Sequence, residues 1–335
     1  MPKCSKCGKR FDSLSALQDH YKAVHPNQRF VPPKTSTARN FTVILVIGII
    51  AVASVSGYLV YGQLNQKTNT VQTSLLGTVI PPDLMNNLTG VSYSTLNAVG
   101  SGQGVTPPSI ISGTALTSGG KPVMLYIGGE FCPYCAVQRW GMIVALAKFG
   151  NFSGIEYMQS SSSDIYPNTF TFSFHQSTYN SPYVVFAPYE AYDRSDNPQS
   201  PSPAANYAAL QQQYDPSGGI PFVDIANKFA VDTSSQISPT VLSKFDNWTQ
   251  IASQLNNASA PVAKAIDGEA NTLITAICKV DGGKPTSLCS QSFANLPFAS
   301  SSSSSTAGII QIPLQITTAN YPEQLISRYA ARSIS

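Results

Sequence analysis

The sequence predicts a mixed α/β fold for the larger part of the chain, on three observations. Short apolar runs of strand length alternate with longer helix-like runs; strands are expected at residues 123–127, 155–158, 183–186 and 222–225, and helices at residues 137–149, 204–214 and 266–278. Residues 169–174 alternate polar and apolar side chains, which is the period of a strand. Charged residues make up 11% of the chain and hydrophobic residues 42%, a balance that favours folding over disorder. Strands and helices in alternation indicate a layered α/β domain.

The N-terminal segment predicts a small metal-binding domain. Cys4, Cys7, His20 and His25 follow the spacing C-x2-C-x12-H-x4-H, which is typical of a ββα zinc finger. Two thiolates and two imidazoles complete a tetrahedral site, so the expected Zn²⁺ is structural. Residues 1–27 should depend on this metal for folding, because so short a segment has little core of its own.

The finger is not expected to bind specific DNA sequences. Zinc fingers of this kind contact bases from helix positions −1, 3 and 6, which here are Ser13, Ala16 and Asp19. None of the three is Arg, Lys, Asn or Gln, and Asp19 repels phosphate. Residues 1–40 hold eight Lys and Arg against two Asp, a balance that suits nucleic acid or anionic lipid. We favour a module that binds a cytoplasmic protein or senses zinc over one that reads DNA.

The apolar run at residues 41–61 predicts a membrane anchor. It holds 21 residues without a charge, enough for one transmembrane helix across a hydrocarbon core of about 30 Å. The basic residues before it place the N-terminus in the cytoplasm and the rest of the chain outside, in a single-pass cell-membrane protein. Residues 28–40 are expected to form a linker and residues 62–105 a stalk.

The sequence Cys132-Pro133-Tyr134-Cys135 predicts a redox-active dithiol. It lies between an expected strand and an expected helix, where free backbone N–H groups and the helix dipole stabilise a thiolate. Cys132 is expected to be the exposed nucleophile and Cys135 the buried resolving thiol. A static disulfide or a metal site is the alternative. Pro221, in a Gly-rich turn before an expected strand, is a candidate cis proline.

The order of strand, CPYC, helix and a later Ile-Pro resembles the thioredoxin superfamily. More closely, residues 110–290 resemble an uncharacterised family of archaeal membrane-anchored thioredoxin-like proteins. The resemblance implies a thioredoxin-like fold with a helical insertion near residues 195–217, and it implies that Pro221 packs against the dithiol and pairs with substrate. The chain departs from the superfamily at Tyr126, which stands where a buried carboxylate is usual; Glu130 is the nearest acid.

The compact domain is expected over residues 106–298, followed by a Ser-rich linker at 299–307 and a tail at 308–335. Cys278 and Cys289 flank a turn-rich segment near its end. Outside the cell such a pair is expected to form a structural disulfide, and a second redox pair is the alternative.

These features together favour a membrane-anchored, extracytoplasmic thiol–disulfide oxidoreductase of the oxidase or isomerase type. Its substrates would be exported proteins with cysteines, and a separate protein would recycle its dithiol. Two other hypotheses stay open: a non-enzymatic transmembrane adaptor, and a regulator that acts through the zinc finger.

Overall fold

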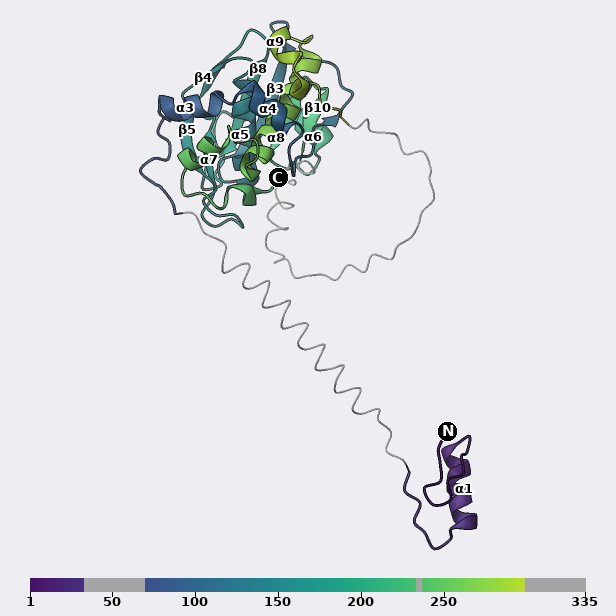
Figure 1. Cartoon of the computed structure of the whole chain (residues 1–335). Helices are drawn as coiled ribbons and strands as arrows, with labels where there is room; N and C mark the ends of the chain where they lie inside the picture. Colours follow the sequence, from purple (N-terminus) through teal and green to yellow (C-terminus); the bar gives the residue numbers. More distant parts are fainter. Residues whose placement is uncertain (33–69, 233–236, 299–335) are drawn as a thin grey trace. The chain divides into compact units, whose positions relative to one another are not determined.

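The computed structural model of the chain describes residues 1–32, 70–232 and 237–298 (Figure 1). The chain divides into two compact units, Met1–Gln66 and Lys67–Ser335. The predicted membrane anchor, the Ser-rich linker and the C-terminal tail lie outside the described residues, as does most of the linker at 28–40.

The smaller unit is built on one helix, α1 (Leu14–Val24). Ser13 caps this helix, because its side chain accepts a hydrogen bond from the backbone N–H of Ala16. The predicted ββα finger has two paired strands before its helix. In the structure, a single antiparallel bridge between Lys3 and Arg10 takes their place. The core contains few side chains: Cys4, Leu17 and Tyr21, with Phe11 and Phe30 packed against them.

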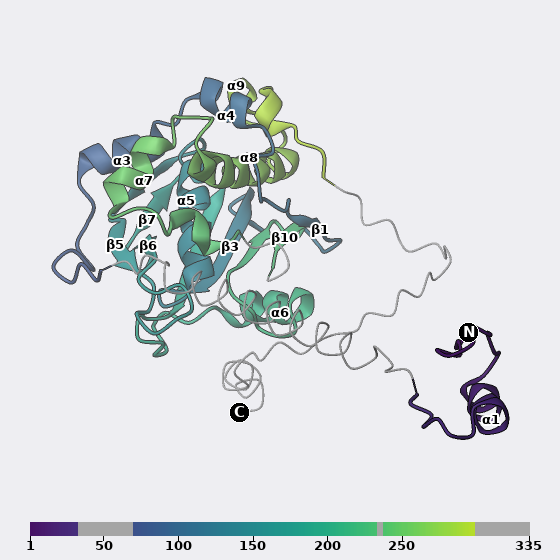
Figure 2. The same ribbon diagram turned by 60° about the horizontal axis from the view of Figure 1, so that its bottom comes forward.

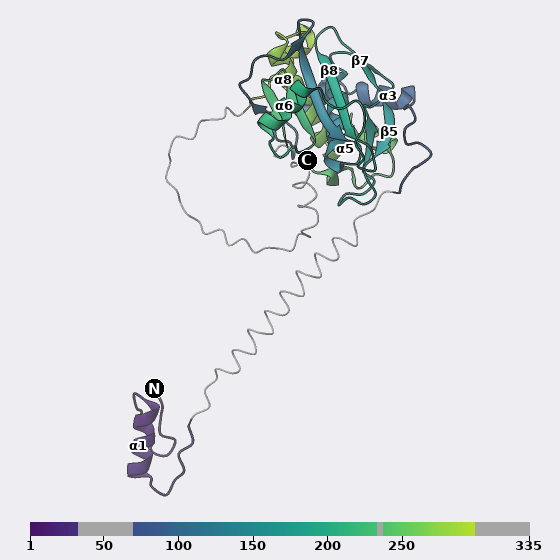
Figure 3. The same ribbon diagram turned by 180° about the vertical axis from the view of Figure 1, so that it is seen from behind.

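The larger unit is organised around one central strand, β3 (Lys121–Gly129). This strand pairs in parallel with β8 (Val185–Tyr192) and antiparallel with β9 (Phe222–Ile225). The sheet continues through β10 (Phe229–Val231) to β1 (Ser109–Ile110), and β2 (Thr117–Ser118) pairs with the start of β3. The same sheet is seen from behind in Figure 3. Because β3 is buried on both faces, its sequence is a continuous apolar run rather than an alternating one.

Each face of the sheet has its own cover. Helices α5 (Pro133–Leu146) and α8 (Pro261–Val280) pack against the face that carries Met124 and Tyr126. Leu125 and Ile127 point to the opposite face, where side chains of α6 (Ala205–Tyr214) join a second apolar cluster. Figure 2 shows α8 and α6 on opposite sides of the sheet. Helix α6 lies within the predicted helical insertion at residues 195–217, and it covers one face of the sheet.

The remaining elements extend the face covered by α5 and α8. Two small antiparallel pairs, β5 with β6 and β4 with β7, carry many of its aromatic side chains. The bounds of these and the other short elements are β4 (Asn151–Ser153), β5 (Glu156–Gln159), β6 (Phe170–Ser173), β7 (Thr178–Asn180), η1 (Pro239–Leu242), α7 (Trp248–Gln254), α9 (Thr286–Cys289) and η2 (Ser292–Ala294).

The expected stalk differs from the structure. Helices α3 (Pro82–Thr89) and α4 (Tyr93–Val99) belong to the larger unit, and Leu84, Leu88 and Leu96 lie in its main core. The many Asn, Ser and Thr residues of this segment cover its outer surface, which hid the helical spacing of Leu84 and Leu88. The domain therefore begins before residue 106.

The membrane part of the predicted fold class is corrected. Within residues 1–32, 70–232 and 237–298, no helix has the length and the apolar character that a bilayer crossing requires. Helix α8 has 20 residues, but Lys264, Asp267, Glu269 and Lys279 interrupt its apolar surface. The fold that the structure supports is a mixed α/β fold.

Candidate functional site

The Cys132–Cys135 pair lies where β3 ends and α5 begins. Cys132 is the N-cap residue of α5, and its sulfur accepts a hydrogen bond from the backbone N–H of Cys135 at 3.3 Å. Pro133 occupies the first turn, where its missing N–H costs nothing. Both cysteines are free thiols. The helix N-terminus thus points unsatisfied N–H groups at the first sulfur, as the sequence predicted.

Both thiols are more enclosed than expected. Cys132 is 3% exposed and Cys135 0%, which differs from the prediction of an exposed nucleophile. Phe131, Tyr134, Tyr192 and Ile220 surround the two sulfurs in one apolar cluster. The cover depends partly on Gly129, because a Cβ at that position would lie 2.8 Å from the ring of Phe131. A molecule that reacts with the Cys132 sulfur must displace part of this cover.

The two thiols differ in acidity. Burial by itself raises the pKa of Cys132, but hydrogen bonds from the Cys135 thiol and N–H and the positive charge of Arg139 outweigh it and lower that pKa. Burial raises the pKa of Cys135 well above its usual value, and the neighbouring Cys132 raises it further. Cys132 is therefore the more acidic of the two thiols and Cys135 the less acidic, and this difference is the one that disulfide exchange needs.

Pro221 lies beside the dithiol although it is distant in sequence. The Ile220–Pro221 peptide bond is cis, and the thiol of Cys132 lies 3.9 Å from the carbonyl oxygen of Ile220 as its donor. Strand β9 starts directly after Pro221. The structure thus brings together the three residues that the sequence analysis singled out as catalytic candidates.

Tyr126 occupies the interior near the dithiol without a hydrogen bond. It is fully buried, and its hydroxyl has no hydrogen-bond partner among the described residues. Burial raises its pKa well above the usual value. Gly128 leaves room for this hydroxyl, because a Cβ there would lie 2.0 Å from it. Tyr126 therefore fills space and does not supply an ionisable group at neutral pH.

Glu130, the acid nearest to the dithiol in the sequence, is hydrogen-bonded to strand β6. Its carboxylate accepts a hydrogen bond from the hydroxyl of Ser173 on β6, and burial raises its pKa. The backbone N–H of His175 donates to the same hydroxyl. These contacts tie the segment before Cys132 to β6 and leave the His175 ring without an assigned role.

Glu190 is a residue of the candidate site that the sequence patterns do not predict. This residue lies on β8, is 3% exposed, and forms a buried ion pair with Arg139 of α5. An isolated Glu within a strand-like sequence, 51 residues from its partner, gives no local signal. Only the parallel pairing of β8 with β3 places it beneath the dithiol motif.

The second candidate site lies in the smaller unit. The ligand atoms of Cys4, Cys7, His20 and His25 all lie within 4.8 Å of one another, so the four side chains could hold a metal ion. The Cys7 sulfur is 3.2 Å from Nε2 of His20. Nε2 of His25 is buried and has no hydrogen-bond partner within the described part of the chain, as expected of an atom that binds a metal ion.

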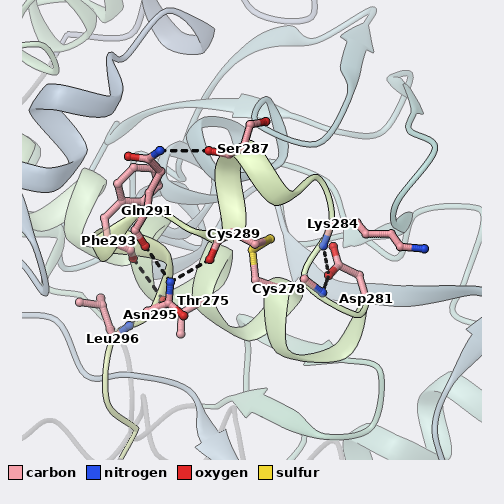
Figure 4. Close-up of a disulfide and its surroundings, with 11 residues drawn as sticks. Thr275, Cys278, Asp281, Lys284, Ser287, Cys289, Gln291, Phe293, Asn295 and Leu296 are labelled. Atoms are coloured by element: carbon pink, nitrogen blue, oxygen red, sulfur yellow. Dashed lines mark hydrogen bonds between the residues drawn. A yellow bond between two sulfur atoms is a disulfide. The ribbon is translucent and has the colours of Figure 1, made fainter.

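Cys278 and Cys289 are joined by a disulfide at the C-terminal end of α8, with a Cα–Cα distance of 5.6 Å (Figure 4). Asp281 accepts hydrogen bonds from the N–H groups of Gly283 and Lys284 and so forms the turn between the two cysteines. Cys278 belongs to the main core, whereas Cys132 and Cys135 form a separate cluster. This placement favours a structural role over a second redox pair.

Comparison with known proteins gives one match. Residues 108–213 match a family described as a domain of unknown function (DUF929). No curated protein and no solved structure matches the chain. The thioredoxin-like part of the predicted fold class is therefore corrected as well, because no neighbour of known structure supports it, and the statement that stands is a mixed α/β fold.

Proposed function

We propose that the larger unit is a thiol–disulfide oxidoreductase that acts through Cys132 and Cys135. The observation that carries the proposal is the division of acidity within one pair of free thiols at a helix N-terminus, with the pKa of Cys132 lowered and that of Cys135 raised. The contact between Cys132 and Ile220 supports it, because a backbone carbonyl oxygen lies 3.9 Å from the reacting sulfur.

The reaction is a two-step exchange. The Cys132 thiolate attacks one sulfur of a substrate disulfide, the substrate S–S bond breaks, and the departing sulfur takes a proton. Cys135 then loses its proton and attacks Cys132, which forms the intrachain disulfide and releases the second substrate thiol. The substrate gains two electrons and two protons, one proton from Cys135 and one from solvent. In the reverse direction the Cys132–Cys135 disulfide oxidises a substrate dithiol by the same steps.

Oxidation or isomerisation of exported proteins is the direction we propose. The Cys278–Cys289 disulfide supports it, because structural disulfides persist in oxidising compartments. In such a compartment, a dithiol that stays reduced needs a separate reductant, and one that transfers disulfides needs a separate oxidant. A recycling partner is therefore part of the proposal.

A turnover assay with the full-length chain tests this proposal. Refolding of a reduced, disulfide-containing substrate should accelerate with the wild-type protein and return to background with Cys132→Ser. Cys135→Ser should accumulate a mixed disulfide between Cys132 and the substrate. Cys7→Ser, in the other unit, is the matched control and should retain activity. Full activity of the Cys132→Ser variant would rule out the mechanism.

For the smaller unit we propose one structural Zn²⁺, bound by Cys4, Cys7, His20 and His25. Two thiolates with two imidazoles are a ligand set that suits zinc, and four protein ligands leave no open position for substrate. DNA recognition gains no support, because Ser13 is engaged as the cap of α1 and Asp19 lies 3.9 Å from Lys22 as its ion-pair partner. Metal analysis of the purified chain should give one zinc per chain, lost in His25→Ala.

A further inference from the structure

A fully buried ion pair lies beneath the proposed dithiol. The Arg139 Nε donates to Oε1 of Glu190 at 2.8 Å, and Nη2 donates to Oε2 at 2.6 Å, with both side chains 0% exposed. Removing two charges from water is costly, and the mutual attraction of such a pair often does no more than offset that cost. The pair is thus weak evidence for a purely stabilising role.

Arg139 is bonded to the backbone of the dithiol motif. Its Nη2 also donates to the carbonyl oxygen of Gly129 at 2.8 Å, and the N–H of Cys132 donates to that same oxygen at 3.2 Å. Arg139 follows Cys135 by four residues on α5, which places the two on the same side of the helix. The Arg139 guanidinium, one helical turn after Cys135, therefore fixes the turn of the chain that leads into Cys132.

The charge of Arg139 acts on both sulfurs, because it lowers the pKa of Cys132 and counteracts the rise in the pKa of Cys135. Tyr126 on β3, whose ring centroid is 5.8 Å from the Arg139 guanidinium carbon, stays neutral because burial raises its pKa. Burial likewise raises the pKa of Glu130. The carboxylate of Glu190, on β8, is bonded to the guanidinium and also accepts from the N–H of Phe174 at 3.2 Å.

We propose that Arg139 and Glu190 are a positioning pair that sets the electron affinity of the dithiol. Arg139 favours the thiolate that appears on reduction, and Glu190 limits this effect. When the Cys132–Cys135 disulfide accepts two electrons from a substrate dithiol, its S–S bond breaks and the substrate S–S bond forms. Of the two protons that the substrate loses, one goes to Cys135 and the other to solvent, so Cys132 remains a thiolate. A cation beneath the sulfurs stabilises that product, so the disulfide becomes a stronger oxidant. The inference rests on the proposed function and gives it a direction.

Two single substitutions test the pair, because they should act in opposite directions. Glu190→Gln keeps a hydrogen-bonding side chain but leaves the Arg139 charge without its counter-ion. It should shift the equilibrium with glutathione about tenfold toward the reduced dithiol and lower the pKa of Cys132 by about one unit. Arg139→Gln should shift the equilibrium about tenfold toward the disulfide and raise that pKa by a similar amount.

The measurement uses the full-length chain in glutathione buffers, with alkylation of Cys132 and Cys135 read at the level of single peptides. The pKa of Cys132 comes from its alkylation rate as a function of pH. Lys148→Met is the matched control: it removes a partly buried cation that lies two residues beyond the C-terminal end of α5, whereas Cys135 lies in the first turn of that helix, and it should leave both values unchanged. If the pair had only a structural role, both single substitutions would shift the glutathione equilibrium and the pKa of Cys132 in the same direction, or neither would shift them. That result would overturn the inference.

The double substitution Arg139→Met with Glu190→Met keeps the test decisive if a single variant fails to fold. Apolar pairs of similar volume often replace buried ion pairs without loss of stability. Without either charge, the equilibrium should move toward the disulfide and the pKa of Cys132 should rise; unchanged values would overturn the inference. The proposed function can fail separately, because a wild-type chain without turnover on protein substrates would still show these shifts.

Discussion

Two Cys-x-x-Cys pairs in this chain have the same spacing and different surroundings. Cys4 and Cys7 lie in a small unit in which two histidine nitrogens come within 4.8 Å of them. Cys132 and Cys135 lie at the N-terminus of a buried helix, with aromatic side chains around them. Among the described residues, they belong to no group of three or more His, Cys, Asp or Glu side chains that could hold a metal ion. The Cys-x-x-Cys spacing therefore only brings two sulfurs together. The neighbouring side chains determine whether the pair suits metal binding or disulfide exchange.

Removal of the metal should produce the largest difference between the two pairs. The core of the smaller unit rests on Cys4, Leu17 and Tyr21, and structural zinc supplies about 10–16 kcal/mol in small fingers. A chelator should therefore unfold α1 while the larger unit stays folded. Hydrogen exchange measured separately for residues 14–24 and for α5 checks this. Exchange protection of α1 that survives chelation would contradict the zinc assignment.

The two units should also respond oppositely to pH. In the larger unit, burial raises the pKa of Asp267 to about 8 and that of Glu269 to about 7. Acids with raised native pKa values contribute stability that is complete below their unfolded pKa and is lost as pH rises through the native one. Glu269 alone should cost on the order of 3 kcal/mol of unfolding free energy between about pH 4.5 and pH 8.

Lys148 offsets this loss of unfolding free energy only at pH values above its own native pKa. Burial lowers its pKa to about 8, so its contribution is present above its unfolded pKa and is lost as pH falls through the native one. Zinc binding in the smaller unit strengthens as pH rises, because its ligands must be deprotonated. Denaturant unfolding of the larger unit between pH 4.5 and 8 checks the sign. A stability that rises over this range would contradict the raised pKa values of the two buried acids, and Glu269→Gln should flatten the curve.

The aromatic cover should account for a smaller, kinetic difference. Tyr134 is partly exposed and packs against the cluster that holds Cys132. Tyr134→Ala should open this cover and raise the alkylation rate of Cys132 by about tenfold, since reactivity follows both thiolate character and access. The rate at Cys7 in the zinc-loaded chain serves as the internal control and should not change. An unaltered rate at Cys132 would show that Tyr134 does not control access.

Tyr126→Phe should have the smallest effect. The hydroxyl of Tyr126 is buried with no hydrogen-bond partner among the described residues, and a buried unsatisfied polar group costs about 1–3 kcal/mol. Phe keeps the ring against Arg139. The unfolding free energy should stay equal or rise by about 1 kcal/mol, and dithiol activity should persist. A loss of activity would assign the hydroxyl a role in proton transfer.

The helices and strands that depend on short-range sequence patterns could be predicted. The strand around residues 123–127, the helix after Cys135 and the helix with buried Ile266 to Cys278 follow from apolar runs and from their length. The proximity of Pro221 to Cys132 could be anticipated only from the order of motifs. Helices α3 and α4 were missed, because their few apolar residues are separated by Asn, Ser and Thr.

The long-range features could not be predicted in this way. The Arg139–Glu190 pair depends on which strand lies beside β3, and single-sequence patterns do not specify strand partners. The burial of Cys132 depends on four side chains from three separate segments of the chain. The thioredoxin-like fold class and the membrane-spanning helix were predicted from local patterns, and neither is supported by the described structure.

One measurement tests the contrast between the two pairs most directly: the oxidation state of each pair, read by peptide-level alkylation of the zinc-loaded, full-length chain across glutathione buffers of known potential. Cys132 and Cys135 should interconvert between dithiol and intrachain disulfide with a midpoint of about −120 to −200 mV, the range of oxidases and isomerases. Cys4 and Cys7 should stay metal-bound and unoxidised over that range. A Cys132–Cys135 pair that does not form a disulfide, or that binds zinc in place of the smaller unit, would contradict the account.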